Sequence, residues 1–532
     1  MTARSEGAVY NLDLHLLYSK WARDITGTQD PVSGAIGDTA PFRRGNKPAD
    51  AVCSSYIYAP FLVYRHYGDD RALRENYEGF RKWTEYLYRN SDRGIAIYSL
   101  YGDWAGPEPD SFNGGSPVSG ITSGQYMSSC FNYYNARLMQ EVARITGHGE
   151  DEKMYADRVS ELCTRLNDVY YDRVSANYST GSQAANIFAL ELGIVPQSEQ
   201  ARVAANINAD IVKRGYHLST GNLCTKYLPE ILTRYGYLET AMKLMEQTTY
   251  PSWGYMRSKG ATTIWERWEY ATGFAMNSHS HPMYGSITAW FYKYLAGITV
   301  SEPAFRRFRV HPYLPENMPA CSGSIETPYG RIVSAWKKTA SGWSLHIEVP
   351  VSCKAVVELE GTGVTVDGSA PDSCPGVSTE SRTDAMTVLT LECGKYDIAV
   401  ARKSRYRNKP NRQKARTPAG ARLFCNALII GPSAILLKRN AVCILIDIAG
   451  KDHNTLDKTP DIAYAAAKAQ AYLRNALAGV AQIKVVNAKT SEQHAKQTRR
   501  HFGFLLIRCV LRQRSAAIGA ECRARLHLRA AI

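Results

Sequence analysis

Apolar residues recur at helical spacing on either side of a short glycine turn, and this pattern constrains the fold of the first 300 residues most strongly. Ser123 is placed to cap a helix that Gly147-His148-Gly149 would end. A second helix follows, and so short a turn makes the two helices an antiparallel hairpin. The apolar positions are Met127, Phe131, Tyr134, Leu138, Val142 and Ile145, then Tyr155, Val159, Leu162, Leu166 and Val169.

Further helix pairs are predicted before Gly297 from the same kind of apolar spacing. They are Leu12–Ile25 with Ser54–Tyr67, Gln183–Leu192 with Gln200–Arg214, and Leu218–Tyr235 with Leu238–Gln247. Repeated antiparallel hairpins over residues 1–300 predict a helical barrel or toroid rather than a simple bundle.

The pattern changes near Ser301, where short runs of β-forming residues replace the helical spacing. Turn residues such as Ser341-Gly342 and Gly394-Lys395 separate these runs. The predicted strands are Arg331–Trp336, Trp343–Val349, Ala355–Leu359, Met386–Leu391 and Tyr396–Val400. This succession predicts an antiparallel β-sandwich over residues 301–402.

Charged residues are unevenly distributed along the chain, and its C-terminal part is strongly basic. Residues 401–532 hold 26 Lys and Arg against 6 Asp and Glu, which leaves 38 against 43 in residues 1–400. Two interpretations of the tail, residues 403–532, stay open. Attachment to nucleic acid or an anionic surface is one, but the aromatic residues that usually accompany such binding are nearly absent. A non-native or disordered extension is the interpretation we favour, so no nucleic-acid partner is expected.

Cysteine usage and hydropathy exclude several other classes. The twelve cysteines show no paired CxxC spacing and no cluster with histidine, so neither a metal site nor a disulfide framework is predicted. The chain contains no run of about 20 apolar residues, so no membrane span is predicted. The first residues lack the apolar core of a signal peptide.

One stretch, Gly260-Ala261-Thr262-Thr263-Ile264-Trp265-Glu266-Arg267-Trp268-Glu269, places a carboxylate between two indoles. A pyranose ring packs its apolar face on an indole while a carboxyl group works at the anomeric carbon. A core pair of tryptophans with a salt-bridged glutamate is the alternative. The residues of this stretch alone leave the two interpretations open.

Several motifs in a fixed order give the chain a specific resemblance. They are Gly37-Asp38-Thr39-Ala40-Pro41, Tyr101-Gly102-Asp103-Trp104, His217-Leu218-Ser219-Thr220-Gly221, Thr249-Tyr250-Pro251-Ser252-Trp253-Gly254-Tyr255, the stretch from Gly260 to Trp268, and Met276-Asn277-Ser278-His279-Ser280-His281. Over about residues 3–400 the chain resembles the bacterial α-L-rhamnosidases of glycoside hydrolase family 78. The resemblance implies a mainly α fold, an (α/α)6 barrel that is incomplete here, followed by a β-sandwich.

The resemblance also implies an activity and the residues that carry it. The family hydrolyses terminal α-L-rhamnosides with inversion, and its general base falls on Glu266. Trp104 and His281 match residues of the sugar pocket, whereas Asp103 either holds a sugar hydroxyl or caps the following turn. The remaining assignments are that Trp253 and Trp265 support the pocket wall and that Glu269 pairs with a basic side chain. No cofactor is implied, because two carboxyl groups and water suffice.

The chain also departs from the family. The Asp/Arg-rich segment that carries the family's general acid precedes the region matching Met1, and Glu6 lies too late to replace that acid. Cys53 stands where relatives usually place a pocket tryptophan. We therefore expect a truncated copy that is a poor catalyst alone. The rivals are a non-catalytic carbohydrate-binding remnant and another (α/α)6 glycosidase, which would lack this combination of motifs.

Overall fold

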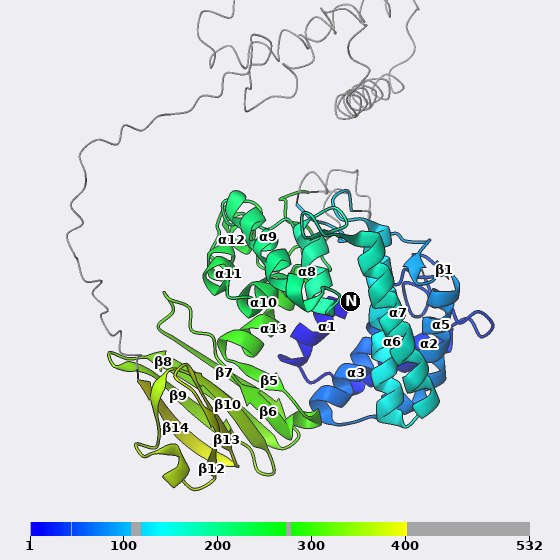
Figure 1. Ribbon diagram of the computed structural model, residues 1–532. Coiled ribbons are helices and arrows are strands. Elements are labelled where there is room, and N and C mark those ends of the chain that lie inside the picture. Colours follow the sequence, from blue (N-terminus) through cyan, green and yellow to red (C-terminus); the bar gives the residue numbers. More distant parts are fainter. Residues whose placement is uncertain (1, 44, 108–118, 273–277, 402–532) are drawn as a thin grey trace, which may run out of the picture. The chain divides into compact units, whose positions relative to one another are not determined.

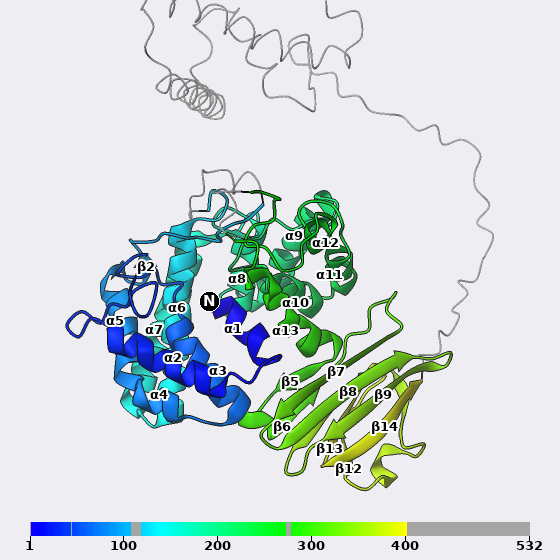
Figure 2. The same cartoon turned by 180° about the vertical axis from the view of Figure 1, so that it is seen from behind.

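Secondary structure divides the described part of the chain into a helical region and a β region. The computed structural model describes residues 2–43, 45–107, 119–272 and 278–401, and the basic tail lies outside them. The main helices are α1 (Thr2–Val9), α2 (His15–Thr28), α3 (Ser55–Tyr67), α4 (Arg71–Glu75), α5 (Tyr77–Arg89), α6 (Gly124–Thr146), α7 (Gly149–Tyr170), α8 (Gln183–Leu192), α9 (Gln200–Lys213), α10 (Tyr227–Arg234), α11 (Leu238–Met245), α12 (Trp253–Ser258) and α13 (Thr288–Trp290). Both views of the ribbon show these helices curving around α1 (Figure 1, Figure 2).

The α6–α7 hairpin forms as its sequence predicts. The Ser123 hydroxyl accepts the N–H of Tyr126, which begins α6, and Gly147 ends it with a φ of 86° that suits glycine. Helix α7 buries Tyr155, Leu162 and Leu166. Only the end of the predicted apolar face is wrong: Val169 is exposed, because it lies in the last turn before the chain leaves the helix.

Two other predicted helices begin later than expected. Helix α2 begins at His15 rather than Leu12. Helix α10 begins at Tyr227, nine residues after the predicted Leu218, because side-chain and backbone oxygens of a distant loop bind the intervening N–H groups. The predicted bounds of α8 match those of the structure, and α9 and α11 end one and two residues before theirs.

Two five-stranded sheets pack face to face after residue 297 and bury one apolar core between them. One sheet has the order β12 (Val377–Arg382), β13 (Met386–Leu391), β10 (Lys354–Glu360), β6 (Arg307–Val310), β5 (Ile298–Val300). The other has the order β11 (Thr362–Val366), β14 (Gly394–Ala401), β9 (Gly342–Val349), β8 (Gly330–Lys338), β7 (Ala320–Thr327). Only β6 and β10 pair in parallel among these described strands. The predicted fold class, a mainly helical domain followed by a β-sandwich, is confirmed.

A buried cluster of four charges joins parts of the helical domain that are far apart in sequence. Lys226 Nζ lies 2.6 Å from Glu6 Oε2 and 3.1 Å from Glu230 Oε1. Lys293 Nζ lies 3.0 Å from Glu6 Oε1 and 2.7 Å from Glu230 Oε2. Each charge therefore has two partners of opposite sign, which compensates the loss of hydration.

The lysines and glutamates of this cluster determine one another's protonation states. Burial alone would raise the pKa of Glu6, but Lys226 and Lys293 outweigh burial and hold that pKa well below its usual range. Burial likewise opposes the charge of Lys293, yet Glu230 and Glu6 raise the lysine pKa well above its usual range. Glu230 and Glu6 raise the pKa of Lys226 in the same way. Glu6, Lys226 and Lys293 are therefore ionised at neutral pH, and Glu6 has no proton to donate.

In the part of the chain that the structure describes, no helix combines the length and the apolar character that crossing a membrane requires.

Replacing Glu6 with Gln should lower the free energy of unfolding by about 3–5 kcal/mol, because both lysines of the cluster lose a buried counter-charge. Urea unfolding at neutral pH measures the change. Asp24→Asn is the control, since Asp24 forms an exposed pair with Lys20 and should contribute less than about 1 kcal/mol. Because the folded-state pKa of Glu6 is lowered, its contribution is fully present well above 4.5, the ordinary value, and declines as the pH falls below it. A free energy of unfolding equal to that of the wild type would contradict the role of the cluster.

Candidate active site

Two segments around the indole-flanked carboxylate bind each other through their backbones. The N–H of Glu266 donates to the carbonyl of Ser278 at 3.0 Å, and the N–H of His281 donates to the carbonyl of Ile264 at 2.8 Å. These bonds fix the backbones of both predicted site residues, Glu266 and His281. Asn277 of the same motif lies outside the described residues.

Glu266, His281 and Trp104 lie together. His281 Nε2 is 3.8 Å from Glu266 Oε1, and the His281 ring meets the Trp104 ring edge-on with centroids 6.4 Å apart. Burial, with the positive charge of Arg4 nearby, lowers the pKa of His281 to about 4. The imidazole is therefore neutral at neutral pH, so one ring nitrogen donates and the other accepts.

Trp104 and His281 line a cavity of about 460 Å³, whereas Glu266 is not among its described lining residues. The walls of this cavity come from helix α2, the start of α3 and several loops, and they include Asp38, Cys53, Tyr101, Trp104, Asn222 and His281. Aromatic, amide, carboxyl and imidazole groups thus surround a space large enough for a small polar ligand.

Several polar atoms of this cavity's lining are buried without a hydrogen-bond partner among the described residues. They are Nε1 of Trp104, Nδ2 and Oδ1 of Asn222, and Nδ1 of His281. Buried polar groups in native proteins are nearly always paired, because each unpaired group costs about 1–3 kcal/mol. These atoms keep hydrogen-bonding capacity that water or a polar ligand can complete.

Asp103 fixes the turn at residues 221–224. Its carboxylate accepts the N–H groups of Gly221 at 2.6 Å and of Leu223 and Cys224 at 3.0 Å, and it is buried. In these contacts Asp103 holds the distant turn at residues 221–224, which neither alternative named. The N–H of Asn222, between them, donates to the carbonyl of Trp104 at 2.6 Å. All four N–H groups from Gly221 to Cys224 therefore bind Asp103 or Trp104.

The neighbouring tryptophans pack behind the cavity. Trp253 donates its indole N–H to the carbonyl of Tyr284 at 3.2 Å and meets Trp268 edge-on. Trp265 is buried and packs against Tyr270. Trp253, Trp265 and Glu266 are all absent from the described cavity lining, and Glu266 lies next to the lining residue His281.

The other glutamate of the motif has a different partner. Glu269 Oε1 lies 3.3 Å from Arg267 Nη1, so the predicted pairing of Glu269 with a basic side chain is confirmed.

Sequence reasoning assigned no role to Asp38, Tyr101 and Asn222. Asp38 Oδ2 accepts the Tyr101 hydroxyl at 2.8 Å and the Asn46 N–H at 2.8 Å. Asp38 and Tyr101 belong to motifs of the resemblance, and Asn222 directly follows another, so motif membership was the available signal. Cys53 also lines the cavity, and burial raises the pKa of its thiol, which is therefore protonated.

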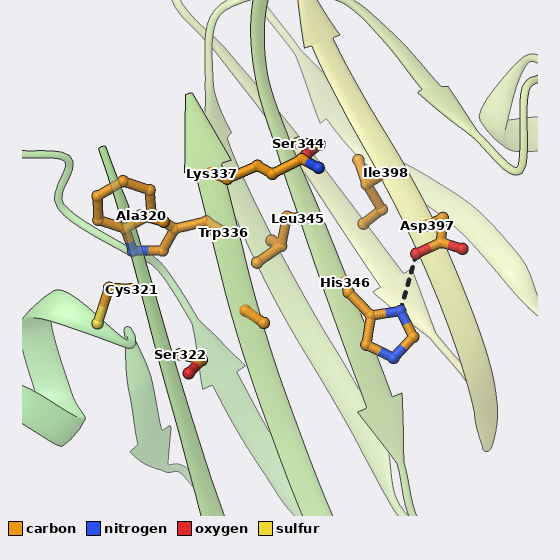
Figure 3. A pocket seen from close by; sticks show the side chains of 11 residues that line it. Ala320, Cys321, Ser322, Trp336, Lys337, Ser344, Leu345, His346, Asp397 and Ile398 are labelled. Carbon is orange, nitrogen blue, oxygen red and sulfur yellow. Dashed lines mark hydrogen bonds and ion pairs between the residues drawn. The ribbon is translucent and has the colours of Figure 1, made fainter. Parts of the chain in front are cut away.

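A second cavity, of about 520 Å³, lies on the sheet that contains β7, β8, β9 and β14 (Figure 3). His346 Nδ1 and Asp397 Oδ1 are 2.8 Å apart there. Ser322 supplies a hydroxyl in the same row of paired residues across the strands. Ala335 pairs with both Ser322 and His346 and so lies between them. Two strand spacings amount to about 9.5 Å, too far for Ser322 to donate to the imidazole. The row is therefore no catalytic triad.

Two protein-family models match the chain. The model described as the bacterial alpha-L-rhamnosidase 6 hairpin glycosidase domain matches residues 1–295. The model described as the bacterial alpha-L-rhamnosidase C-terminal domain matches residues 297–369. The first match alone extends over more than half of the 532 residues.

Individual proteins show the same similarity. An alpha-L-rhamnosidase of Formosa agariphila is 26% identical over 358 residues, which are 66% of this chain and 38% of that protein. One of Alteromonas sp. (strain LOR) is 30% identical over 304 residues, 56% of this chain and 33% of that protein. The solved alpha-L-rhamnosidase from Dictyoglumus thermophilum superposes with a TM-score of 0.69 at 30% identity, covering 75% of this chain and 45% of that one. The chain thus spans less than half the length of each.

Replacing Asp103 with Asn should lower the free energy of unfolding by about 1.5–3 kcal/mol, because one carboxylate oxygen becomes an amide donor that faces a backbone N–H and the other becomes a neutral acceptor. Thermal or urea unfolding measures the loss. Asp172→Asn is a matched control, since Asp172 also accepts a backbone N–H, from Val174, but at an exposed turn. Equal effects of the two substitutions would contradict a special role for Asp103.

His281 should stay neutral until the pH falls to about 4. NMR of ring-labelled histidine measures this titration, and His281→Gln assigns the resonance. The same residue in urea should titrate near the ordinary value of about 6.5. Because the folded pKa is the lower one, the contribution of His281 to stability is complete above 6.5 and is lost as the pH falls toward 4. A native midpoint near 6.5 would show that partial burial does not lower the pKa of this imidazole.

Proposed function

The chain belongs to the bacterial α-L-rhamnosidase family, and from that premise we propose that it acts on terminal α-L-rhamnosides by inverting hydrolysis. The observation that carries the proposal is a cavity with unpartnered polar atoms in its lining, one of whose lining residues, His281, lies next to Glu266. A glycosyl unit offers hydroxyls to those atoms and an apolar ring face to an indole such as that of Trp104.

Glu266 is the proposed general base. Its carboxylate removes a proton from a water molecule while that water attacks the anomeric carbon on the face opposite to the aglycone. The bond between the anomeric carbon and the glycosidic oxygen breaks, and the departing oxygen takes a proton from a general acid. The products are β-L-rhamnose and an alcohol, so atoms and charges balance.

His281 is proposed to bind a sugar hydroxyl rather than to transfer protons. With a pKa of about 4 it carries no charge at neutral pH, so its contact with Glu266 is not an ion pair there. A neutral imidazole offers one donor and one acceptor to neighbouring hydroxyls. The proposal for Trp104 is a contact with the sugar through its ring and its indole N–H.

We assign the general acid to no described residue. Glu6 is held ionised by Lys226 and Lys293, and the Asp103 carboxylate accepts backbone N–H groups. A substrate whose leaving group departs without protonation therefore tests the base separately. p-Nitrophenyl α-L-rhamnopyranoside is such a substrate, because its nitrophenolate is a stable anion.

Glu266→Gln should reduce the hydrolysis of p-nitrophenyl α-L-rhamnopyranoside by about 10²–10⁴-fold, because the attacking water loses its base. Release of nitrophenolate by the purified chain measures the rate, and proton NMR of the first product should show the β anomer. Glu141→Gln, on the exposed face of α6, is the control and should keep the wild-type rate.

Chemical rescue sharpens this test. In Glu266→Gly, azide fits the space of the lost side chain and attacks the anomeric carbon without needing a base. Restored nitrophenolate release with β-L-rhamnosyl azide as product supports the assignment. An α product would contradict inversion, and a Glu266→Gln rate equal to that of the wild type would contradict the base. Binding of L-rhamnose without any turnover would favour a carbohydrate-binding protein instead.

A further inference from the structure

Backbone hydrogen bonds fix the position of Asn222 in the wall of the cavity. Its own N–H donates to the carbonyl of Trp104, and the N–H groups on either side of it, of Gly221 and Leu223, donate to Asp103. The backbone also approaches very closely here: a Cβ on Gly221 would lie 2.2 Å from the carbonyl oxygen of Trp104. Only glycine permits this approach, so the side chain of Asn222 projects from a rigid turn.

The amide of this side chain is buried and has no protein partner. Asn222 is 1% exposed and lines the cavity, and neither Nδ2 nor Oδ1 has a hydrogen-bond partner among the described residues. Exchanging the positions of the two amide atoms would not change this, because both are unpartnered. A buried amide in this state costs stability until water or a ligand supplies its partners.

The chemistry of the amide and its neighbours defines the missing ligand. Nδ2 donates and Oδ1 accepts, and the two atoms stand side by side, as do two hydroxyls on adjacent ring carbons. Trp104 Nε1, also unpartnered, offers a donor. A group that both donates and accepts satisfies this set, whereas a carboxylate or phosphate, which only accepts, would leave Oδ1 of Asn222 unpaired.

We propose that Asn222 binds two adjacent hydroxyl groups of the glycosyl unit through its side-chain amide and thereby selects unsubstituted sugars. This inference rests on the proposed function and adds a recognition residue to it. One hydroxyl accepts a hydrogen bond from Nδ2 and the other donates one to Oδ1. A sugar methylated at the donating hydroxyl cannot pair Oδ1 and is therefore rejected.

Asn222→Leu separates recognition from structure. Leucine has a similar shape and no polar atoms, so it removes an unsatisfied amide from the empty protein while removing both contacts to the sugar. The full chain carrying Asn222→Leu should bind L-rhamnose at least 10-fold more weakly by isothermal titration calorimetry. Its melting temperature without sugar should equal or exceed that of the wild type.

Asn132→Leu is the matched control. Asn132 is also buried with an unpartnered Oδ1, but its Nδ2 donates to the carbonyl of Gly94 at 2.9 Å and it does not belong to the described cavity lining. This variant should have a lower melting temperature and an affinity for L-rhamnose within about twofold of the wild type. The two substitutions therefore have opposite effects on stability and on binding.

The outcomes distinguish the inference from the function on which it rests. If the wild type binds L-rhamnose and Asn222→Leu binds it equally well, Asn222 is not a recognition residue. If Asn222→Leu instead melts at a clearly lower temperature, its amide is structural and the inference is overturned. If the wild type binds no L-rhamnose, the proposed function fails and the inference fails with it. Deoxy-rhamnoses locate the contact: the sugar lacking the bound hydroxyl should bind wild type and Asn222→Leu with similar affinity.

Discussion

The buried cluster of Glu6, Lys226, Glu230 and Lys293 is the interaction on which the helical domain depends. It binds α1, at the beginning of the described chain, to α10 and to the helical turn Phe291–Leu295 just before the sandwich. Hydrophobic contacts alone would allow α1 several rotations, whereas four charges with paired partners fix one. The helices can therefore curve around α1 in a single arrangement, and Arg4 at its beginning acts on the protonation of His281.

A second set of hydrogen bonds fixes part of the cavity wall. Asp103 and Trp104 bind four consecutive N–H groups of residues 221–224, so one loop determines the conformation of another 118 residues later. The same two residues thus shape the turn that carries Asn222 and place an indole beside it. Pocket polarity and backbone geometry are consequently coupled, because a shift of the turn would move the amide and the indole together.

Local periodicity predicted the elements whose ends are set by neighbouring residues. The hairpin of α6 and α7 is correct because Ser123 and Gly147 supply its caps from within the segment. The helix predicted from Leu218 is wrong over its first half, because the N–H groups there bind Asp103, an acceptor remote in sequence. Strands β7 and β12 were not predicted, since β7 has mixed small and polar residues and β12 is largely exposed.

From the sequence, site residues could be predicted only where a motif contains them. Asn222 could not be predicted, because its lack of hydrogen-bond partners arises only in the folded chain. Motifs pointed to Glu266, Trp104 and His281, but no pattern in the sequence distinguishes Asn222 from buried asparagines such as Asn135, whose amide nitrogen is bonded to backbone carbonyls. The distinction arises when the folded chain leaves one amide beside a cavity without partners. Recognition residues of this kind lower the stability of the empty protein, so their contribution appears only when a ligand completes their hydrogen bonds. A site that is destabilising when empty gains specificity when filled, because any ligand lacking the matching hydroxyls leaves that destabilisation in place.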